Sequence, residues 1–538
     1  MLGPDVPLVG APGPRARKRR GRRWFAVVAL APLAVLPGVA AAQPRSDPAS
    51  VEVRPATLGQ PPPEWRRNAA AWPGHNYDLA NTRATTTTPI SSRNVSHLRE
   101  KWRLPLEGQA FFGIFASNPI VLDDTIYLID LTSQVYAVDK ETGRVKWRRA
   151  FNDFNVGPNG VAYGWGLLFG TTHTGIFALD ARTGETVWSR ELIGAELGGI
   201  DLAPQVYDNT VIVSTVPSAL DRYVPGTMGI VYALDPWTGA TKWDFNTVKD
   251  GYLWGNPELN SGGGLWYPPA VDAAGRVFIS IGNPGPFPGT PEFPNGTSRP
   301  GDNLYTNSIV ALDGQTGRLL WYQQVAPHDL RDYDLQISPI VTHVPIDGVR
   351  TEIVVVAGKM GAVYAYRADD GTPLWSLSVG RHENDTGLLP DDPIPVLPGL
   401  FGGVETPMAV AHGAVFVPWV DLAMNMSSTT YEFPDVTQGT GGLVAADVAT
   451  GRVRWKRDLP QMSLGGATVA NDVVFASSFD GTTYAFDTRT GRTLWTAAAR
   501  AGINSFPAVA GDTLLVGAAA PLLTGQQAMP ELIAYSLD

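Results

Sequence analysis

One motif, A-x-D-x-x-T-G-x-x-x-W, recurs along the 538-residue chain and constrains its fold more than any other feature. The complete copies end at Trp147, Trp188, Trp243, Trp321, Trp455 and Trp495. A degenerate copy ending at Trp375 has Arg367 in place of the first Asp, and "HLREKW" at Trp102 keeps only the part after the turn. The alternating apolar residues before the turn predict a strand, D-x-x-T-G predicts a turn closed by a side-chain hydrogen bond and a glycine, and the Trp begins the return strand.

These units predict a closed ring of blades. A single hairpin of this kind cannot bury its apolar face, so neighbouring units must stack on one another. The last residues, 531–538, read "ELIAYSLD" and resemble the strand that precedes the turn in the other copies. They supply the half-unit that is missing before Trp102. The sequence therefore predicts an all-β, eight-bladed β-propeller of four-stranded antiparallel blades, closed by pairing of the N- and C-terminal strands, with the repeat tryptophans packed between blades.

The first 42 residues have the features of an export signal. Basic residues concentrated between Arg15 and Arg23 precede the apolar run "FAVVALAPLAVLPGVAAA". The run is short and contains Pro32 and Pro37, which disfavours a retained membrane helix. The string "RRWFAV" matches a twin-arginine signal, and an ordinary secretory signal is an equally good interpretation of this region. We expect a signal peptide at 1–42, an N-terminal arm at 43–85, a quinoprotein-like propeller at 86–538, and a periplasmic or extracellular location.

Charge and cysteine content narrow the possible partners. Without residues 1–42 the net charge moves from −10 to −16, because seven basic residues and Asp5 are removed. So acidic a protein is a poor partner for nucleic acid or for an anionic membrane surface. The chain contains no cysteine, which excludes disulfides, thiolate metal sites and covalent c-type haem. Any electrons that the protein handles must therefore pass to a separate acceptor.

The spacing of the repeats indicates where a binding face lies. Neighbouring repeat tryptophans are 40 to 55 residues apart, except for 78 residues between Trp243 and Trp321 and 80 between Trp375 and Trp455. Extra residues in a propeller form loops on one face, which is commonly the binding face. The first long interval precedes "APHDLRDYD", residues 326–334, which gathers three aspartates and a histidine. Such a loop is either a solvated turn or part of a site for a hard cation.

From residue 72 onward the chain resembles the pyrroloquinoline quinone (PQQ) dependent alcohol dehydrogenases, eight-bladed quinoproteins that carry this tryptophan motif. The resemblance rests on "WPGHNYDLANTR" and on the ordered combination of "GGGLWYPP", "GNP", "RPGDN" and "PHDxxDYD". It implies an exported oxidoreductase that oxidises an alcohol, a sugar or a polyol with PQQ and a bound metal ion. Electrons would pass to a separate acceptor protein.

The resemblance also implies roles for single residues. Trp266 matches the tryptophan that forms the floor under the quinone ring, and Asn283 matches an amide that coordinates the metal. Asp332 matches the general base, which would also contact the metal, and Lys359 matches the cation that hydrogen-bonds the quinone oxygens. Asp334 would add a second carboxylate to a site for Ca²⁺ or, alternatively, a lanthanide.

The metal-binding glutamate of the family is missing from its expected place. Ala219 lies near that position, and no Glu is close by. The string "GAELGG" contains Glu196, but it follows Trp188 too closely and is interpreted as a loop. Asp201 and Asp221 are the candidate carboxylate replacements.

Other positions depart from the family as well. The adjacent-cysteine pair that covers the quinone falls at residues 153–154, where Phe154 could stack on the ring instead. A cofactor-contacting arginine appears as Asn159, a pocket asparagine as Glu405, and a tryptophan of the seventh inter-blade region as Leu464.

Two classes of function therefore remain open. Asp332 and Lys359 on consecutive blades favour a PQQ-dependent dehydrogenase acting on CH–OH groups. The missing glutamate favours a non-catalytic propeller that serves as an extracytoplasmic interaction scaffold. A third class, glycan hydrolysis by Asp332 and Glu405, requires two carboxylates flanking a groove, and no spacing rule supports that pair.

Overall fold

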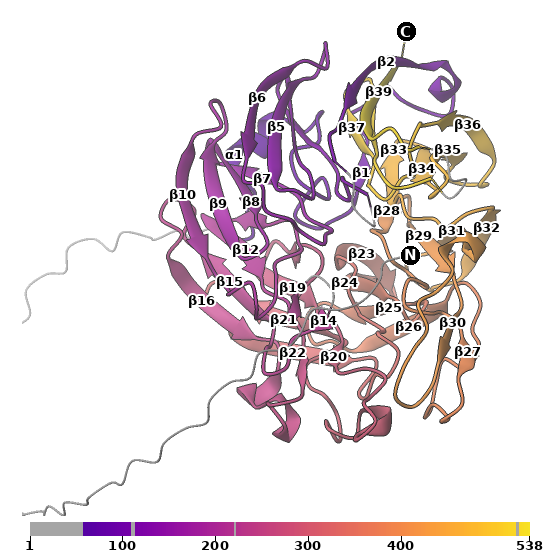
Figure 1. Ribbon diagram of the computed structural model, residues 1–538. Coiled ribbons are helices and arrows are strands. Elements are labelled where there is room, and N and C mark those ends of the chain that lie inside the picture. Colours follow the sequence, from indigo (N-terminus) through magenta and orange to yellow (C-terminus); the bar gives the residue numbers. More distant parts are fainter. Residues whose placement is uncertain (1–57, 109–112, 220–221, 523–526, 538) are drawn as a thin grey trace, which may run out of the picture. The chain divides into compact units, whose positions relative to one another are not determined.

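The computed structural model describes residues 58–108, 113–219, 222–522 and 527–537. The expected signal peptide at 1–42 and residues 43–57 of the expected arm lie outside these ranges. Within them the strands form eight four-stranded antiparallel blades arranged around a central axis (Figure 1). This confirms the predicted eight-bladed β-propeller. None of the described helices is long and apolar enough to cross a membrane.

Each blade runs from an inner strand beside the axis to an outer strand that carries the repeat tryptophan. The first four blades are β3 (Ile120–Leu122), β4 (Thr125–Ile129), β5 (Gln134–Asp139) and β6 (Val145–Ala150); β7 (Ala162–Gly164), β8 (Leu167–Thr171), β9 (Gly175–Asp180) and β10 (Thr186–Glu191); β11 (Gln205–Tyr207), β12 (Thr210–Ser214), β15 (Ile230–Leu234) and β16 (Thr241–Asn246); and β18 (Ala270–Val271), β19 (Arg276–Ser280), β21 (Ser308–Asp313) and β22 (Leu319–Gln324).

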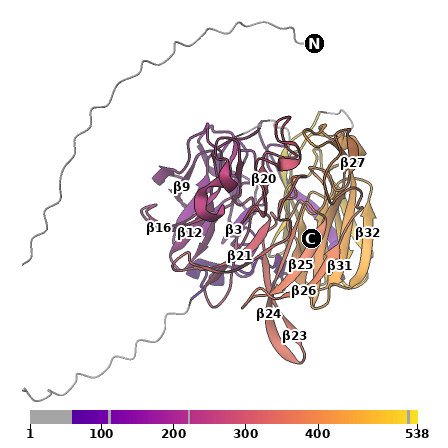
Figure 2. The same cartoon turned by 90° about the horizontal axis from the view of Figure 1, so that it is seen from below.

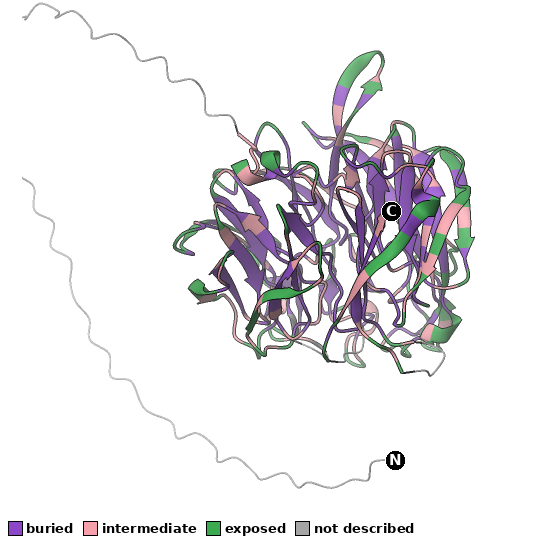
Figure 3. Ribbon diagram, turned by 90° about the horizontal axis from the view of Figure 1, so that it is seen from above, coloured by how far each residue is buried: buried purple, intermediate pink, exposed green. Residues whose placement is uncertain are grey.

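The other four blades follow the same order. They are β23 (Ile340–Ile346), β24 (Val349–Gly358), β25 (Ala362–Arg367) and β26 (Pro373–Ser378); β28 (Ala409–Ala411), β29 (Ala414–Asp421), β31 (Thr440–Asp447) and β32 (Val453–Leu459); β33 (Ala467–Ala470), β34 (Val473–Ser477), β35 (Thr482–Asp487) and β36 (Thr493–Ala498); and β37 (Ala508–Ala510), β38 (Thr513–Ala518), β39 (Glu531–Leu537) and β2 (Leu98–Pro105). Figure 3 shows that the inner strands are largely buried, whereas the outer strands, the turns and the hairpin tips carry exposed residues.

The repeat motif joins each blade to the next. In the first copy the Asp139 Oδ1 atom accepts hydrogen bonds from the backbone N–H of Thr142 at 2.9 Å and from its hydroxyl at 2.7 Å. Gly143 has a φ of 69°, and a Cβ atom there would lie 2.6 Å from the ring of Trp102 on the preceding blade. The Trp102 Nε1 atom donates to the carbonyl of Lys140 at 2.9 Å.

The same contact recurs around the ring, which confirms the predicted inter-blade role of these tryptophans. The donors in the following copies are Trp147, Trp188, Trp243, Trp321, Trp375 and Trp455. Trp495 instead meets Tyr535 edge-on, with ring centroids 5.2 Å apart, because the last blade lacks the D-x-x-T-G turn.

Strands from the two ends of the chain pair to close the ring of blades. β39 pairs antiparallel with β2, with Ala534 opposite Trp102, as predicted from the two half-units. The buried Glu531 at the start of β39 pairs with Arg103 of β2 at 2.5 Å and with Arg500 at 2.5 Å. These contacts join strands from the two ends of the sequence.

Residues 70–83, part of the expected arm, run along the inner strands of several blades. Their carbonyl groups accept hydrogen bonds from inner-strand N–H groups: Leu79 from Val271 at 2.7 Å and Thr82 from Val410 at 2.9 Å are two examples. β1 (Ala84–Thr85) then pairs in parallel with β33. This segment satisfies backbone donors at the inner edges, which would otherwise lack partners near the axis.

The two long intervals carry extra elements over one face. They include β17 (Ser261–Gly262) with β20 (Pro284–Gly285) and β27 (Ile394–Val396) with β30 (Met424–Met426), and the pair β13 (Ser218–Ala219) and β14 (Arg222–Tyr223) precedes them. The short helices are α1 (Pro63–Arg67), η1 (Val95–His97), η2 (Lys249–Gly251), η3 (Leu253–Gly255), η4 (Pro294–Gly296) and η5 (Val436–Gln438). A buried cluster joins Phe287, Leu330, Val396 and Met426, so both insertions pack onto the acidic loop. Figure 2 shows β20 and β27 on the face opposite the protruding β23–β24 hairpin.

Candidate functional site

A cavity of about 680 Å³ lies where loops of most blades meet the two insertions. Blade loops contribute Leu131, Phe154, Trp266, Lys359, Glu405, Leu464 and Asn504 to its lining. The insertions contribute Phe287, Leu400, Phe401, Tyr431 and Phe433. The cavity thus lies on the face that the repeat spacing predicts for binding.

Lys359 brings the two aspartates of the acidic loop together. It follows β24 directly, and its Nζ atom lies 2.6 Å from the Asp332 Oδ2 atom and 2.7 Å from the Asp334 Oδ2 atom. Its backbone N–H donates to the carbonyl of Asp334 at 3.0 Å. Asp332 has a φ of 63°, in the left-handed region, a strained conformation for a residue other than glycine. Such strain persists where the surrounding structure imposes it, as it does at many functional sites.

The three carboxylates of the acidic loop are buried and engaged inside the protein. Asp329 accepts hydrogen bonds from the backbone N–H groups of Arg331 at 2.8 Å and Tyr333 at 2.7 Å. Both Asp332 and Asp334 are buried. The alternative of a solvated turn is therefore wrong for residues 329–334, whereas Pro327 at the start of the loop is exposed.

Burial sets the protonation behaviour of the pair. It raises the pKa of Asp332 to about 7, with Lys359 opposing the shift and Asp334 adding to it. Burial alone would lower the pKa of Lys359, but the carboxylates of Asp332, Asp334 and Glu405 raise it well above its ordinary value. Lys359 is therefore a fixed ammonium, and Asp332 is a carboxyl group that can exchange a proton near neutral pH.

Asn283 also contacts this cluster. Its backbone N–H donates to the Asp334 Oδ1 atom at 2.7 Å, and its side-chain oxygen accepts a hydrogen bond from the Tyr223 hydroxyl. Gly282 permits this close approach, because a Cβ atom there would lie 2.8 Å from Asp334 Oδ1 and 3.1 Å from Trp266 Nε1. Tyr223 was not predicted from the sequence, because the family resemblance implies a glutamate, and not a tyrosine, in that region.

The proposed metal-binding residues offer oxygen atoms, the ligands that a hard cation prefers. Asp332, Asp334 and Asn283 lie together, and the buried Asp332 Oδ1 atom has no hydrogen-bond partner. The donor chemistry therefore suits a cation. Lys359 and Tyr223 already engage three of these oxygens, so a cation would compete with both. No group of three or more acidic or histidine side chains suited to a metal occurs in the described ranges.

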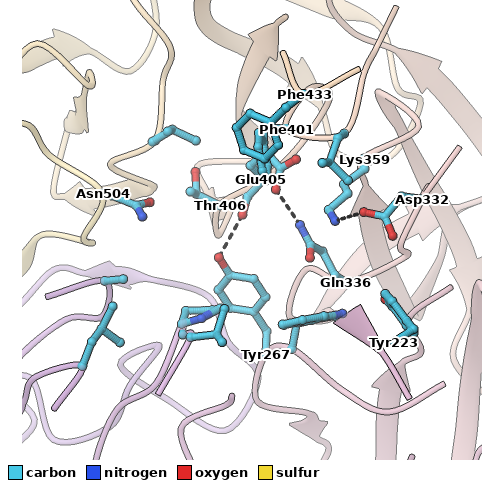
Figure 4. Close-up of a pocket in the computed structure, with 18 of the residues that line it drawn as sticks. Tyr223, Tyr267, Asp332, Gln336, Lys359, Phe401, Glu405, Thr406, Phe433 and Asn504 are labelled. Carbon is cyan, nitrogen blue, oxygen red and sulfur yellow. Dashed lines mark hydrogen bonds and ion pairs between the residues drawn. The ribbon is translucent and has the colours of Figure 1, made fainter. Parts of the chain in front are cut away.

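Glu405 lies on the other side of Lys359 from Asp332 (Figure 4). Its Oε2 atom accepts a hydrogen bond from Gln336 Nε2 at 2.8 Å, and its main-chain oxygen accepts one from the Tyr267 hydroxyl at 2.8 Å. Burial raises the pKa of Glu405 to about 8, and Lys359 partly opposes this shift. The sequence indicated Glu405 as a departure from the family and as one of two carboxylates considered for glycan hydrolysis, not as a group beside Lys359.

Aromatic side chains form much of the remaining wall. Trp266 and Phe154 line the same cavity as Asp332 and Lys359. Phe287 and Tyr431 stack with ring centroids 5.7 Å apart, and Phe401 meets Phe433 edge-on at 5.4 Å. Flat apolar walls with a few polar groups suit a planar organic ligand.

The other candidate acids lie outside the cavity lining. Glu196 is exposed in a turn, in agreement with its interpretation as a loop residue. Asp201 is fully buried, and burial raises its pKa to about 7, against the opposing effect of the backbone groups of Gly157 and Val156. Asp221 lies outside the described residues.

Asn159 also lies away from the cavity. It is buried and donates to the carbonyl of Asp130 at 2.9 Å. Leu464, in contrast, contributes to the cavity wall.

Two family models and a set of curated proteins match parts of this chain. Residues 194–383 match the family described as glucose/ethanol/alcohol dehydrogenase, beta-propeller domain, and residues 88–224 and 433–529 match the family described as outer membrane protein assembly factor BamB. The chain is 27% identical over 520 residues to a quinohemoprotein alcohol dehydrogenase of Comamonas testosteroni, a match that covers 82% of this chain and 71% of that protein.

Solved structures share the fold. The quinohemoprotein alcohol dehydrogenase ADHIIG from Pseudomonas putida HK5 has a TM-score of 0.77 at 23% identity, covering 88% of this chain and 81% of that one. A europium-containing methanol dehydrogenase has a TM-score of 0.74 at 21% identity, covering 88% of this chain and 100% of that one.

Proposed function

We propose, since the chain belongs to the family of PQQ-dependent alcohol dehydrogenases, that it is an exported quinoprotein that oxidises an alcohol. The observation that carries this proposal is the buried pair of Asp332 and Lys359 at the wall of a cavity that also contains Trp266. Asp332 is a proton acceptor, Lys359 provides a fixed positive charge, and Trp266 provides a flat apolar surface.

The cavity suits PQQ in size and chemistry. Trp266 provides a planar apolar surface, Phe154 is available to stack, and Lys359 supplies a positive charge for acceptor oxygens. The Oγ1 atom of Thr406 is buried without a hydrogen-bond partner and lies on a lining residue. PQQ, when bound, supplies the two-electron acceptor for the oxidation.

The side chains of the protein have separate tasks in this proposal. Asp332 accepts the hydroxyl proton of the alcohol on a carboxylate oxygen, because its pKa lies near neutrality. Lys359 holds the Asp332 carboxylate in place and stabilises negative charge that develops beside it. The aromatic residues of the insertions limit the access of water to this centre.

The metal belongs to the same proposal. Asn283, Asp332 and Asp334 would hold Ca²⁺ or, alternatively, a lanthanide, and the ion would act as a Lewis acid. The europium-containing relative supports testing both ions.

The substrate is proposed to be a small-molecule alcohol or sugar, and the electrons are proposed to pass to a separate acceptor protein. The absence of cysteine supports the separate acceptor, because this chain cannot attach a c-type haem covalently. The basic and apolar residues of 1–42 support export to the periplasm or beyond.

A non-catalytic scaffold is the second candidate. The hydrogen bond from Tyr223 to Asn283, at a proposed metal ligand, favours it. Purified protein reconstituted with PQQ and either Ca²⁺ or La³⁺ should reduce an artificial dye when simple alcohols are added. No dye reduction with either ion, in protein that is folded and loaded with PQQ, would support the scaffold and overturn the dehydrogenase.

A further inference from the structure

Lys359 is the only lysine, arginine or histidine among the described residues that line the cavity, and two aspartates already engage it. Glu405 lines the same cavity but forms no ion pair with any described basic residue. A carboxylate at position 405 would therefore have to share Lys359 with Asp332 and Asp334. Glu405 is partly buried, and a partly buried carboxylate that forms no ion pair is costly, so the neutral acid is favoured there.

The hydrogen bonds of Glu405 indicate which oxygen carries the proton. Gln336 donates to Oε2, so that atom already acts as an acceptor. Oε1 is shielded from solvent and has no hydrogen-bond partner. A neutral carboxyl group with its proton on Oε1 would present an unused O–H donor at the cavity wall.

We propose that Glu405 is a ligand-binding residue, which holds its proton on Oε1 and donates it in a hydrogen bond to a carbonyl or carboxylate oxygen of a planar, anionic ligand. The identity of that ligand as PQQ rests on the proposed function. The protonation of Glu405 follows from this chain's own residues.

The surroundings of Glu405 support a neutral acid. Asp332 and Asp334 repel its negative form, while Lys359 attracts it, and the Tyr267 hydroxyl engages only the main-chain oxygen. Arg83 interacts electrostatically with Tyr267, whose hydroxyl donates to the main-chain oxygen of Glu405. Burial is the largest effect, and it raises the pKa of Glu405 to about 8.

A ligand that carries several carboxylates should consequently bind less tightly at alkaline pH. Below about pH 8 Glu405 donates a hydrogen bond, whereas above it an added negative charge repels the ligand. For one linked proton, the dissociation constant should rise by up to about tenfold for each pH unit above that value.

The first test is a titration of the purified protein with PQQ, followed by quenching of tryptophan fluorescence, between about pH 6 and pH 10. Glu405→Gln keeps the shape and an N–H donor but cannot ionise, so its affinity should lack the alkaline loss seen in the wild type. Glu405→Leu removes the donor and should bind PQQ about fivefold or more weakly even at about pH 6, the effect of losing one hydrogen bond. Asp332 titrates near neutrality in both the wild type and Glu405→Gln, so the difference between them isolates Glu405.

The second test needs no ligand. A folded-state pKa raised from 4.5 to about 8 means that the folded wild type retains a proton that the unfolded chain releases. The wild type should therefore lose stability relative to Glu405→Gln as pH rises from about 4.5 to about 8, and the difference should be constant at higher pH. Urea unfolding of both proteins across this range measures it.

The outcomes are distinguishable. A stability difference that does not change between about pH 4.5 and pH 8 overturns the neutral acid, whatever PQQ does. Equal PQQ affinity of Glu405→Leu and wild type at about pH 6 overturns the ligand contact. A wild type that shows the stability change but binds no PQQ at any pH overturns both the contact and the proposed cofactor, while the protonation state stands.

Discussion

Asp332 gains its proposed reactivity from its neighbours. Burial favours its protonated form, and the ammonium of Lys359, 2.6 Å away, opposes that preference. The balance leaves the pKa of Asp332 at about 7, where a carboxyl group can both take and release a proton in neutral solution. Sequence similarity singled out both residues, but their distance and burial come from the fold.

Lys359→Met should move the pH dependence of turnover. Removing the ammonium raises the pKa of Asp332 further, so the acidic limb of the kcat/KM profile should shift upward by about one pH unit or more. The change should also cost about 3–5 kcal/mol of stability, because it leaves buried carboxylates without a partner. Lys359→Arg is the control, since it keeps the charge and should leave the limb nearly in place. An unshifted limb in folded Lys359→Met protein would rule out Asp332 as the group that titrates.

Tyr223→Phe should strengthen cation binding a few-fold. The tyrosine hydroxyl now donates to the side-chain oxygen of Asn283, and its removal frees that oxygen for a metal. Leaving the buried amide oxygen unpaired should cost about 1–3 kcal/mol of stability in the metal-free protein. Calcium and terbium titrations, with terbium luminescence as the signal, measure the affinity. Weaker binding in the variant would show that the hydroxyl itself serves as a ligand.

At the scale of elements, the D-x-x-T-G turn and the tryptophan form one joint between neighbouring blades. The aspartate closes the turn, the glycine adopts a positive φ, and the tryptophan of the preceding blade packs on that glycine. Each motif position has such a local reason, which is why sequence alone predicted the blades and their joints. The insertions have no such repeat, and so the approach of Tyr223 to Asn283 could not be predicted.

Gly317→Ala should destabilise the protein by about 2–4 kcal/mol, the sum of a left-handed backbone for alanine and an overpacked contact. Gly317 has a φ of 70°, and a Cβ atom there would lie 2.6 Å from the Trp243 ring. Gly348→Ala is the matched control, because Gly348 has a φ of 79° with nothing within 4 Å of the added atom. The control should lose only about 1–2 kcal/mol. Equal losses in urea unfolding would show that the tryptophan contact is readily relieved.

At the scale of the whole molecule, the ring depends on pairing between distant parts of the chain. The C-terminal strand was predictable because its pattern supplied the half-unit missing before Trp102. The path of residues 70–83 along the inner strands was not, because its backbone carbonyls and the buried side chains of Asn81 and Arg83 bond to distant blades, and such contacts leave no periodic pattern in the sequence. Likewise, the pKa of Glu405 is raised mainly because the fold takes its carboxyl group out of water, an effect that Lys359 only partly opposes.

Deletion of residues 531–538 should open the ring. It removes β39 from between β2 and β38 and leaves two unpaired strand edges, together with Arg103 and Arg500 without Glu531. Exposed edges promote association, so size-exclusion chromatography should show oligomers or aggregates, with a lower melting temperature. A monomeric truncated protein with unchanged melting would contradict closure by this strand.

The central claim is that Asp332 is the base beside bound PQQ, and one spectroscopic measurement tests it most directly. Wild type and Asp332→Asn are loaded with PQQ and metal, mixed with an alcohol in the absence of an acceptor, and followed by the absorbance of the cofactor. The account predicts equal PQQ content in both proteins, reduction of the cofactor in the wild type, and at least about a hundredfold slower reduction in Asp332→Asn, as expected for loss of a general base. Reduction at the same rate in both proteins would contradict it.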